Sequence, residues 1–137
     1  MTTDTLHPLV ARLTREFGFP YLDAGGEAAL PAGDSLLFLP AHGKGHLETP
    51  DLAVVLPELV QALGGPSSGM GGAVASPAYE KQLREQLGGI ALPAIVVMRD
   101  GRPLGSLSRM RDWDEFLERL SAVIARADAP ASVPTSH

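Results

Sequence analysis

The sequence predicts one α/β domain, in which a four-stranded mixed sheet is covered by helices on both faces. Segments with helical spacing of apolar residues alternate with short apolar runs, in the order α-β-α-β-α-β-β-α. Residues 36–39 are apolar at every position, as is typical of a central strand buried on both faces. The pair Asp100-Gly101 lies between two strand-like segments and predicts a tight hairpin. With right-handed crossovers for the parallel pairs, these segments form a mixed sheet.

The first half of the chain predicts two helices around one strand. Apolar residues in 6–17 recur at helical spacing, so an amphipathic helix is expected there. The buried strand is expected at 35–40. Thr49 is an N-cap followed by proline, and the helix that it starts is expected to run over 49–63. Pro57 lies inside this helix and removes one backbone donor.

The second half predicts three strands and two helices. Residues 70–75 form a glycine-diluted strand, and Ser76 followed by proline starts the next helix. Residues 94–98 are the clearest strand, and 104–107 return antiparallel to them. A proline precedes 104–107 and cannot donate to a ladder, so this strand is expected at an edge of the sheet. Asp112 begins a variant capping box before the final helix.

Composition limits the function classes. The chain has 137 residues, and we expect one domain over 1–127 and a disordered polar tail over 128–137. Its longest apolar stretch, residues 90–98, is interrupted by Pro93 and is too short to cross a membrane, which takes about 20 residues. The first 17 residues lack the apolar core of a secretory signal, so a cytoplasmic protein is expected.

Charge and cysteine content exclude further classes. The net charge of −5 disfavours nucleic-acid binding, which rests on neutralising phosphates. Residues 16–80 contain eight acidic residues and one basic residue, Lys44, so the negative charge belongs to one half of the chain. The chain has no cysteine, which removes disulfides, thiolate catalysis and cysteine-based metal sites.

The order of motifs over about residues 5–126 resembles thioredoxin. Leu92-Pro93 falls where that family has its cis-proline, and residues 56–59 look like the kinked active-site helix. Where thioredoxins place Cys-x-x-Cys, this chain has Thr49-Pro50-Asp51-Leu52, which cannot exchange thiols with disulfides. Phe38 stands where redox thioredoxins have a buried acid. The resemblance therefore implies a redox-inactive thioredoxin-like fold.

A more specific resemblance concerns hydrogenase maturation. A cysteine-free chain of this length, with an acidic first half, an extended loop at 41–48 and the ending LPAIVVMRDGRPLGSLSRMRDWDEF, is similar to hydrogenase expression proteins of the HyaE/HupG type. The resemblance implies a non-catalytic chaperone without a cofactor. Its implied partner is the precursor of a nickel–iron hydrogenase small subunit, bound through the twin-arginine signal peptide before export. Another hydrogenase maturation protein is a further partner that the resemblance allows.

Two groups of residues are candidates for binding such a peptide. Carboxylates on or beside the helix that replaces the redox site would accept bidentate hydrogen bonds from arginines. These acidic candidates are Glu48, Asp51 and Glu58. An adjoining apolar surface would contact the core of the signal peptide. The apolar candidates are Leu47, Leu52, Leu92 and Pro93.

Other interpretations stay open. His42 and His46 suggest a metal pair, which would make the chain a metal or small-molecule enzyme, although they lie in a glycine-rich segment without a third ligand nearby. A redox-inactive adaptor in another complex would share every local feature of the chaperone. No catalytic serine arrangement is supported. Trp113, at the start of the final helix, is expected to pack in the core.

Overall fold

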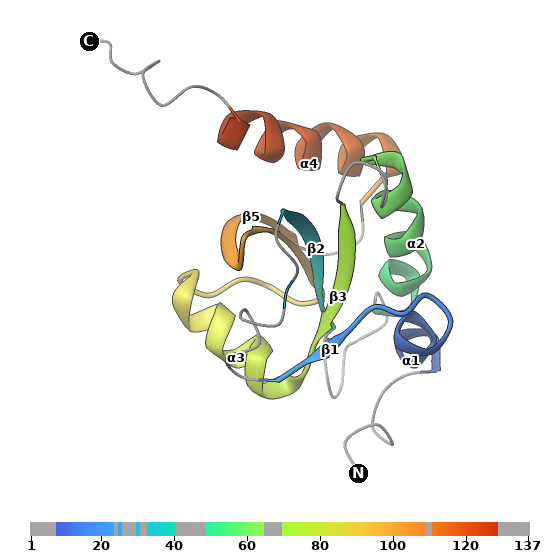
Figure 1. Cartoon of the computed structure of the whole chain (residues 1–137). Coiled ribbons are helices and arrows are strands. Elements are labelled where there is room, and N and C mark those ends of the chain that lie inside the picture. The colour runs from blue at the N-terminus through green and yellow to red at the C-terminus, as the bar shows by residue number, and fades with distance from the viewer. Residues whose placement is uncertain are drawn as a thin grey trace, which may run out of the picture.

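The computed structural model describes residues 8–23, 25, 30, 33–40, 49–64, 70–108 and 111–128. Within these residues the chain forms four helices and five strands (Figure 1). In chain order they are α1 (Pro8–Arg15), β1 (Tyr21–Leu22), β2 (Asp34–Leu39), α2 (Thr49–Ala62), β3 (Gly71–Ala75), α3 (Pro77–Gln86), β4 (Ala94–Arg99), β5 (Arg102–Ser108) and α4 (Trp113–Asp128).

The strands form one mixed sheet in the order β1-β3-β2-β4-β5. The pairs β1·β3 and β2·β3 are parallel, and β2·β4 and β4·β5 are antiparallel. The predicted number of four strands is wrong by one, because β1 was not expected. This strand has two residues, too few for a periodic pattern, and it exists through pairing: Val74 N donates to Pro20 O at 2.9 Å, and Ser76 N donates to Leu22 O at 2.8 Å.

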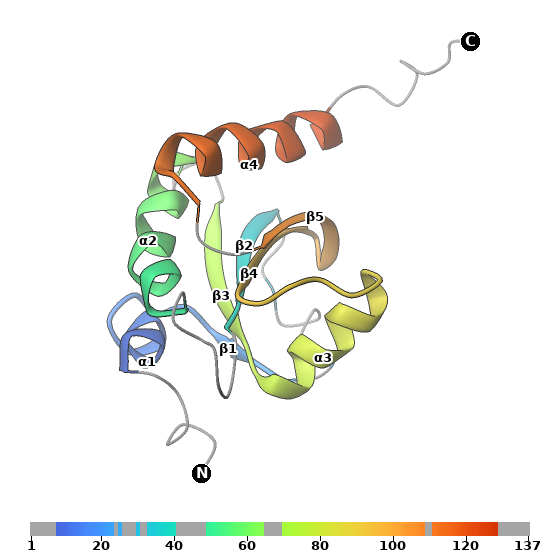
Figure 2. The same cartoon turned by 180° about the vertical axis from the view of Figure 1, so that it is seen from behind.

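Helices cover both faces of the sheet unequally. Figures 1 and 2 show α1, α2 and α4 along one face and α3 on the other. The central strand β2 serves both layers, as its continuous apolar run predicted. Leu36 and Phe38 are buried with the three-helix layer, and Leu37 and Leu39 are buried on the side of α3. This alternation follows from the two-residue repeat of a strand.

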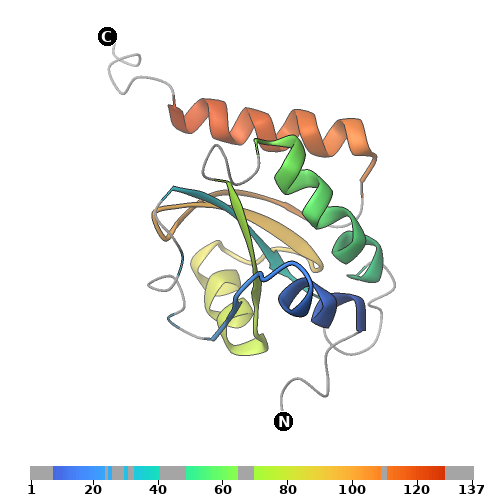
Figure 3. The same cartoon turned by 45° about the vertical axis from the view of Figure 1, so that its right-hand side comes forward.

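The start of α3 lies where the sequence predicted it. The Ser76 side chain caps α3 by accepting a hydrogen bond from Tyr79 N at 3.2 Å. Helix α1 begins at Pro8, and α2 holds Pro57 in its interior. Figure 3 shows α2 lying between α1 and α4 on the three-helix face.

The hairpin between β4 and β5 also matches expectation. Asp100 and Gly101 have φ of 53° and 82°, the left-handed region that such a turn requires. Strand β5 lies at the edge of the sheet, as expected for a strand that carries Pro103. At the start of β2, Asp34 accepts two hydrogen bonds from the Arg99 guanidinium, at 2.7 and 3.0 Å.

The Leu92-Pro93 peptide bond is cis, in agreement with the resemblance to thioredoxin. In the part of the chain that the structure describes, no helix is both long enough and apolar enough to cross a membrane.

Candidate functional site

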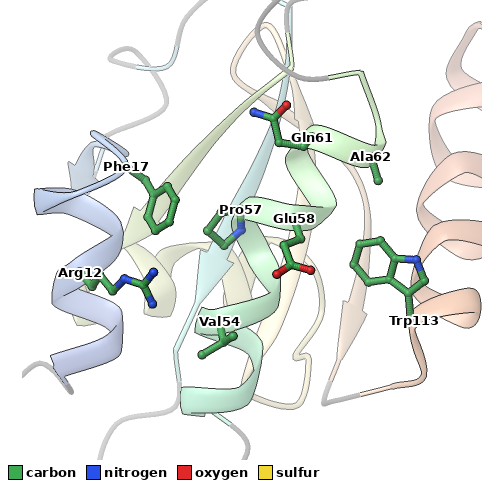
Figure 4. Close-up of a pocket in the computed structure, with 8 residues that line it drawn as sticks. All are labelled: Arg12, Phe17, Val54, Pro57, Glu58, Gln61, Ala62 and Trp113. Atoms are coloured by element: carbon green, nitrogen blue, oxygen red, sulfur yellow. The ribbon is translucent and has the colours of Figure 1, made fainter.

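A shallow groove lies over the outer face of α2, between α1 and the first turn of α4 (Figure 4). We call it the outer groove, and its volume is about 590 Å³. Residues of these three helices and of the segment after α1 line it. They are Arg12, Phe17, Val54, Pro57, Glu58, Gln61, Ala62 and Trp113.

Helix α2 has one face that is buried in the core and an opposite face that lines the groove. Leu52, Leu56 and Leu59 follow the spacing i, i+4, i+7 and are fully buried in the three-helix layer. Val54 and Glu58 are four residues apart on the other side of the helix, and both are exposed. Packing of the leucines against the sheet therefore fixes which α2 side chains the groove presents.

Exposed apolar side chains are concentrated in this groove. Among the described residues, the large apolar side chains that are exposed are Phe17, Val54 and Trp113, with exposed fractions of 42%, 45% and 40%. They come from the segment after α1, from α2 and from α4, and all three line the outer groove. Exposed apolar side chains scattered singly are normal, whereas several in one concave place indicate a surface that binds an apolar partner.

The positive group of the groove is already engaged. Arg12 Nε lies 3.0 Å from Glu16 Oε1, and the guanidinium carbon of Arg12 lies 5.2 Å from the centre of the Phe17 ring. No ion pair to Glu58 is found among the described residues. Glu58 is therefore the charged groove residue that is available to a cation of a partner.

The acidic candidates have different outcomes. Asp51 and Glu58 are both exposed and lie seven residues apart on one face of α2, with Glu58 lining the groove. Glu48 falls outside the described residues.

The apolar candidates are not brought together. Leu52 is fully buried in the core, so its expected contact with a partner is wrong: helix rotation turns its side chain toward the sheet. Leu92 packs against the core layer on the side of α3, away from the groove, and Pro93 is buried. Leu47 falls outside the described residues.

The hypothesis of a metal site is not tested. His42 and His46 fall outside the described residues. Within the described residues, no three histidine, aspartate or glutamate side chains come together as metal ligands would.

Two groove residues were missed by sequence reasoning. Trp113 was expected in the core, and Phe17 was assigned to the apolar stripe of the first helix, yet both are exposed. Helix α1 ends at Arg15, so Phe17 lies beyond its last turn, and Trp113 is the first residue of α4. Side chains at helix ends have fewer neighbours than those in the middle of a stripe, and this position is the signal that could have identified them.

Comparison with known proteins identifies the family of this chain. The family model "Hydrogenase-1 expression protein HyaE" matches residues 9–116. The hydrogenase expression/formation protein HupG of Rhodobacter capsulatus is 42% identical over 122 residues, covering 87% of this chain and 86% of that protein. HoxO of Azotobacter vinelandii, also named a hydrogenase expression/formation protein, is 38% identical over 122 residues, covering 88% of this chain and 80% of that protein.

Solved structures support the same assignment. A crystal structure assigned to the hydrogenase expression/formation protein hupG of Rhodopseudomonas palustris superposes with a TM-score of 0.50 at 28% identity, covering 81% of this chain and 99% of that one. Reduced thioredoxin 2 of Pseudomonas aeruginosa superposes with a TM-score of 0.54 at 19% identity, covering 77% and 93%, and shows the thioredoxin-like fold alone. The chain belongs to the HyaE family of hydrogenase expression proteins.

Proposed function

We propose that this chain is a non-catalytic chaperone of nickel–iron hydrogenase maturation, which binds the precursor of the small subunit through its twin-arginine signal peptide before export. Membership of the HyaE family supports a role in hydrogenase maturation. The observation that carries the finer proposal is the outer groove, where the Glu58 carboxylate, which pairs with no cation among the described residues, lies among exposed apolar side chains.

The chemistry of the groove matches the two parts of such a peptide. Exposed Phe17 and Val54 offer apolar contact to its hydrophobic segment. Asp51 and Glu58 are separated by two turns of α2, about 10 Å along the helix axis. Two adjacent arginines have side chains long enough to reach one carboxylate each, and each guanidinium can donate two hydrogen bonds.

Two candidate residues outside the described part of the chain are included in the proposal. Glu48 precedes α2 by one residue and would add a third carboxylate, and Leu47 would add apolar contact. No catalytic step is proposed, because the chain has no cysteine and the start of α2 holds Thr49 and Leu52 in place of reactive thiols. Binding before export places the proposed activity in the cytoplasm.

A peptide titration tests this function. The small-subunit signal peptide is titrated into the full chain by calorimetry, beside a peptide in which both arginines are lysines, at low and high salt. We expect tighter binding of the arginine peptide and weaker binding at high salt, because salt screens exposed charges. Glu58→Gln is expected to weaken binding, and Glu85→Gln, on exposed α3 outside the groove, is the matched control.

Two results would contradict the proposal. The first is a wild-type chain that binds neither the peptide nor the small-subunit precursor in a pulldown at low salt. The second is binding that Glu58→Gln and Glu85→Gln weaken equally.

A further inference from the structure

We propose that Trp113 and Glu58 together form an arginine-selective site, in which the guanidinium of a partner lies against the indole ring and donates hydrogen bonds to the Glu58 carboxylate. This inference rests on the proposed function, because the same outer groove receives the peptide. It adds a residue of α4 to the site and gives that residue the role of distinguishing arginine from lysine.

The groove already contains an example of such a site, made within the chain. On the side of α1, the guanidinium of Arg12 is held between a carboxylate and an aromatic ring. Its Nε lies 3.0 Å from Glu16 Oε1, and its carbon lies 5.2 Å from the centre of the Phe17 ring. The first distance is within the range of an N–H···O hydrogen bond, and the second is within the range of a cation–π contact.

The α4 side of the groove offers the same two groups to a partner. Figure 4 shows the Trp113 ring extending from the start of α4 toward α2, on the side to which the Glu58 side chain extends, and both residues line the groove. Trp113 keeps 40% of its surface exposed, so one part of its ring is open to contact. No ion pair to Glu58 is found in the part of the chain that the structure describes.

The arginines closest to Trp113 along the described chain are occupied elsewhere. Arg111 lies 2.8 Å from Glu115 and donates to Ser108 O at 3.0 Å, and Arg119 lies 3.1 Å from the same carboxylate of Glu115. Arg12, the cation that lines the groove itself, is held by Glu16. Among the described residues, none of these arginines pairs with Glu58, and we expect the cation that pairs with it in the groove to come from the partner.

The chemistry of the pair favours arginine. A guanidinium is planar and weakly hydrated, so it can stack on an indole ring while its edge donates to a carboxylate. A lysine ammonium is compact and strongly hydrated and gains less from the ring. The carboxylate attracts arginine and lysine alike, whereas the indole ring favours arginine over lysine. The occupant is thus a protein segment with an arginine next to apolar residues, which lie on Phe17 and Val54.

The test uses the full chain and three peptides. They are the small-subunit signal peptide, its lysine–lysine version, and an unrelated peptide with an arginine pair beside an apolar stretch. Trp113 is the one tryptophan of the chain, so its fluorescence reports directly on this place. Variants in which Trp113 is replaced contain no tryptophan, so their affinities are measured by calorimetry.

Substitutions at Trp113 distinguish the contribution of the aromatic ring from that of apolar surface alone. Trp113→Leu keeps an apolar side chain, and we expect the preference for arginine over lysine to fall about fivefold, the ratio that a cation–π contact near 1 kcal/mol provides. Trp113→Phe should retain most of the preference. Glu58→Gln should weaken the arginine and lysine peptides by similar factors. The thermal midpoint of each variant checks that the fold is intact.

The outcomes separate the two proposals. If Trp113→Leu weakens both peptides equally or changes neither, the arginine site is refuted while the chaperone function stands. If the unrelated arginine peptide binds as tightly as the signal peptide, and both depend on Trp113, the arginine site is supported and the proposed partner is not. A wild-type chain that binds none of the peptides refutes both.

Discussion

Replacing Gly72 with alanine is expected to destabilise the fold from within the sheet. A Cβ atom at this position would lie 2.6, 2.7 and 2.9 Å from three carbons of the Phe19 ring. Carbon atoms in contact normally lie 3.5–4.0 Å apart, so the ring must retreat by about 1 Å. The strand cannot yield easily, since β3 is paired with β1 on one side and β2 on the other. Phe19 is also held, because its N–H donates to Leu13 O at 3.0 Å.

The expected cost of Gly72→Ala is about 1–3 kcal/mol in the free energy of unfolding, the range found for overpacking. Urea denaturation followed by circular dichroism measures it. The matched control is Gly71→Ala in the same strand, where a Cβ atom meets nothing within 4 Å. This control should be neutral or slightly stabilising, because alanine restricts the unfolded chain. Equal stabilities of the two variants would refute the packing argument.

The same substitution connects the core to the groove. The ring centres of Phe17 and Phe19 lie 6.0 Å apart, so a displaced Phe19 disturbs the wall that Phe17 forms. We therefore expect Gly72→Ala, and not Gly71→Ala, to weaken binding of an apolar peptide even under conditions in which both variants are folded.

Three further predictions concern the surface and the sheet. Asp34→Asn removes the pair of charged hydrogen bonds with partly buried Arg99 and should lower the free energy of unfolding by about 1 kcal/mol. Urea denaturation measures this change, and an unchanged midpoint would contradict it. The pKa of Tyr21 is raised above its ordinary value of 10.0, first by burial and then by the charge of Asp23. Above about pH 10 the unfolded chain therefore loses this proton before the folded chain does, so the free energy of unfolding falls as pH rises. Tyr21→Phe should reduce that fall, as measured by urea denaturation at several pH values. Val54→Ser should leave the thermal midpoint nearly unchanged, because the side chain is exposed. It should weaken signal-peptide binding measured by calorimetry, and an affinity equal to that of the wild-type chain would argue against the groove as the binding surface.

Sequence patterns predicted the elements whose signals are local. The apolar run of β2, the Ser76 cap of α3 and the Asp100-Gly101 turn each depend on residues that are close along the chain, and the structure confirms all three. Strand β1 could not be predicted in this way, because it is defined by pairing with a strand about fifty residues later.

The candidate site shows the same limit. Leu52 belonged both to the apolar stripe of its helix and to the group of partner-binding candidates, and only packing against the sheet decides between these roles. The outer groove brings together Phe17, Val54 and Trp113, which are far apart along the chain. No periodic pattern links them, so their common location depends on how α1, α2 and α4 pack together.

The position of the outer groove also explains how a thioredoxin-like fold can support binding without redox chemistry. The leucines of α2 that face the sheet form part of the core, whereas the opposite face of that helix is exposed to solvent. In this chain that face carries Asp51, Val54 and Glu58, between a phenylalanine after α1 and a tryptophan at the start of α4. The start of α2 contains no cysteine. The proposed binding role therefore depends on an exposed helix face that presents a carboxylate among apolar side chains, a combination that is complementary to a cationic, apolar segment.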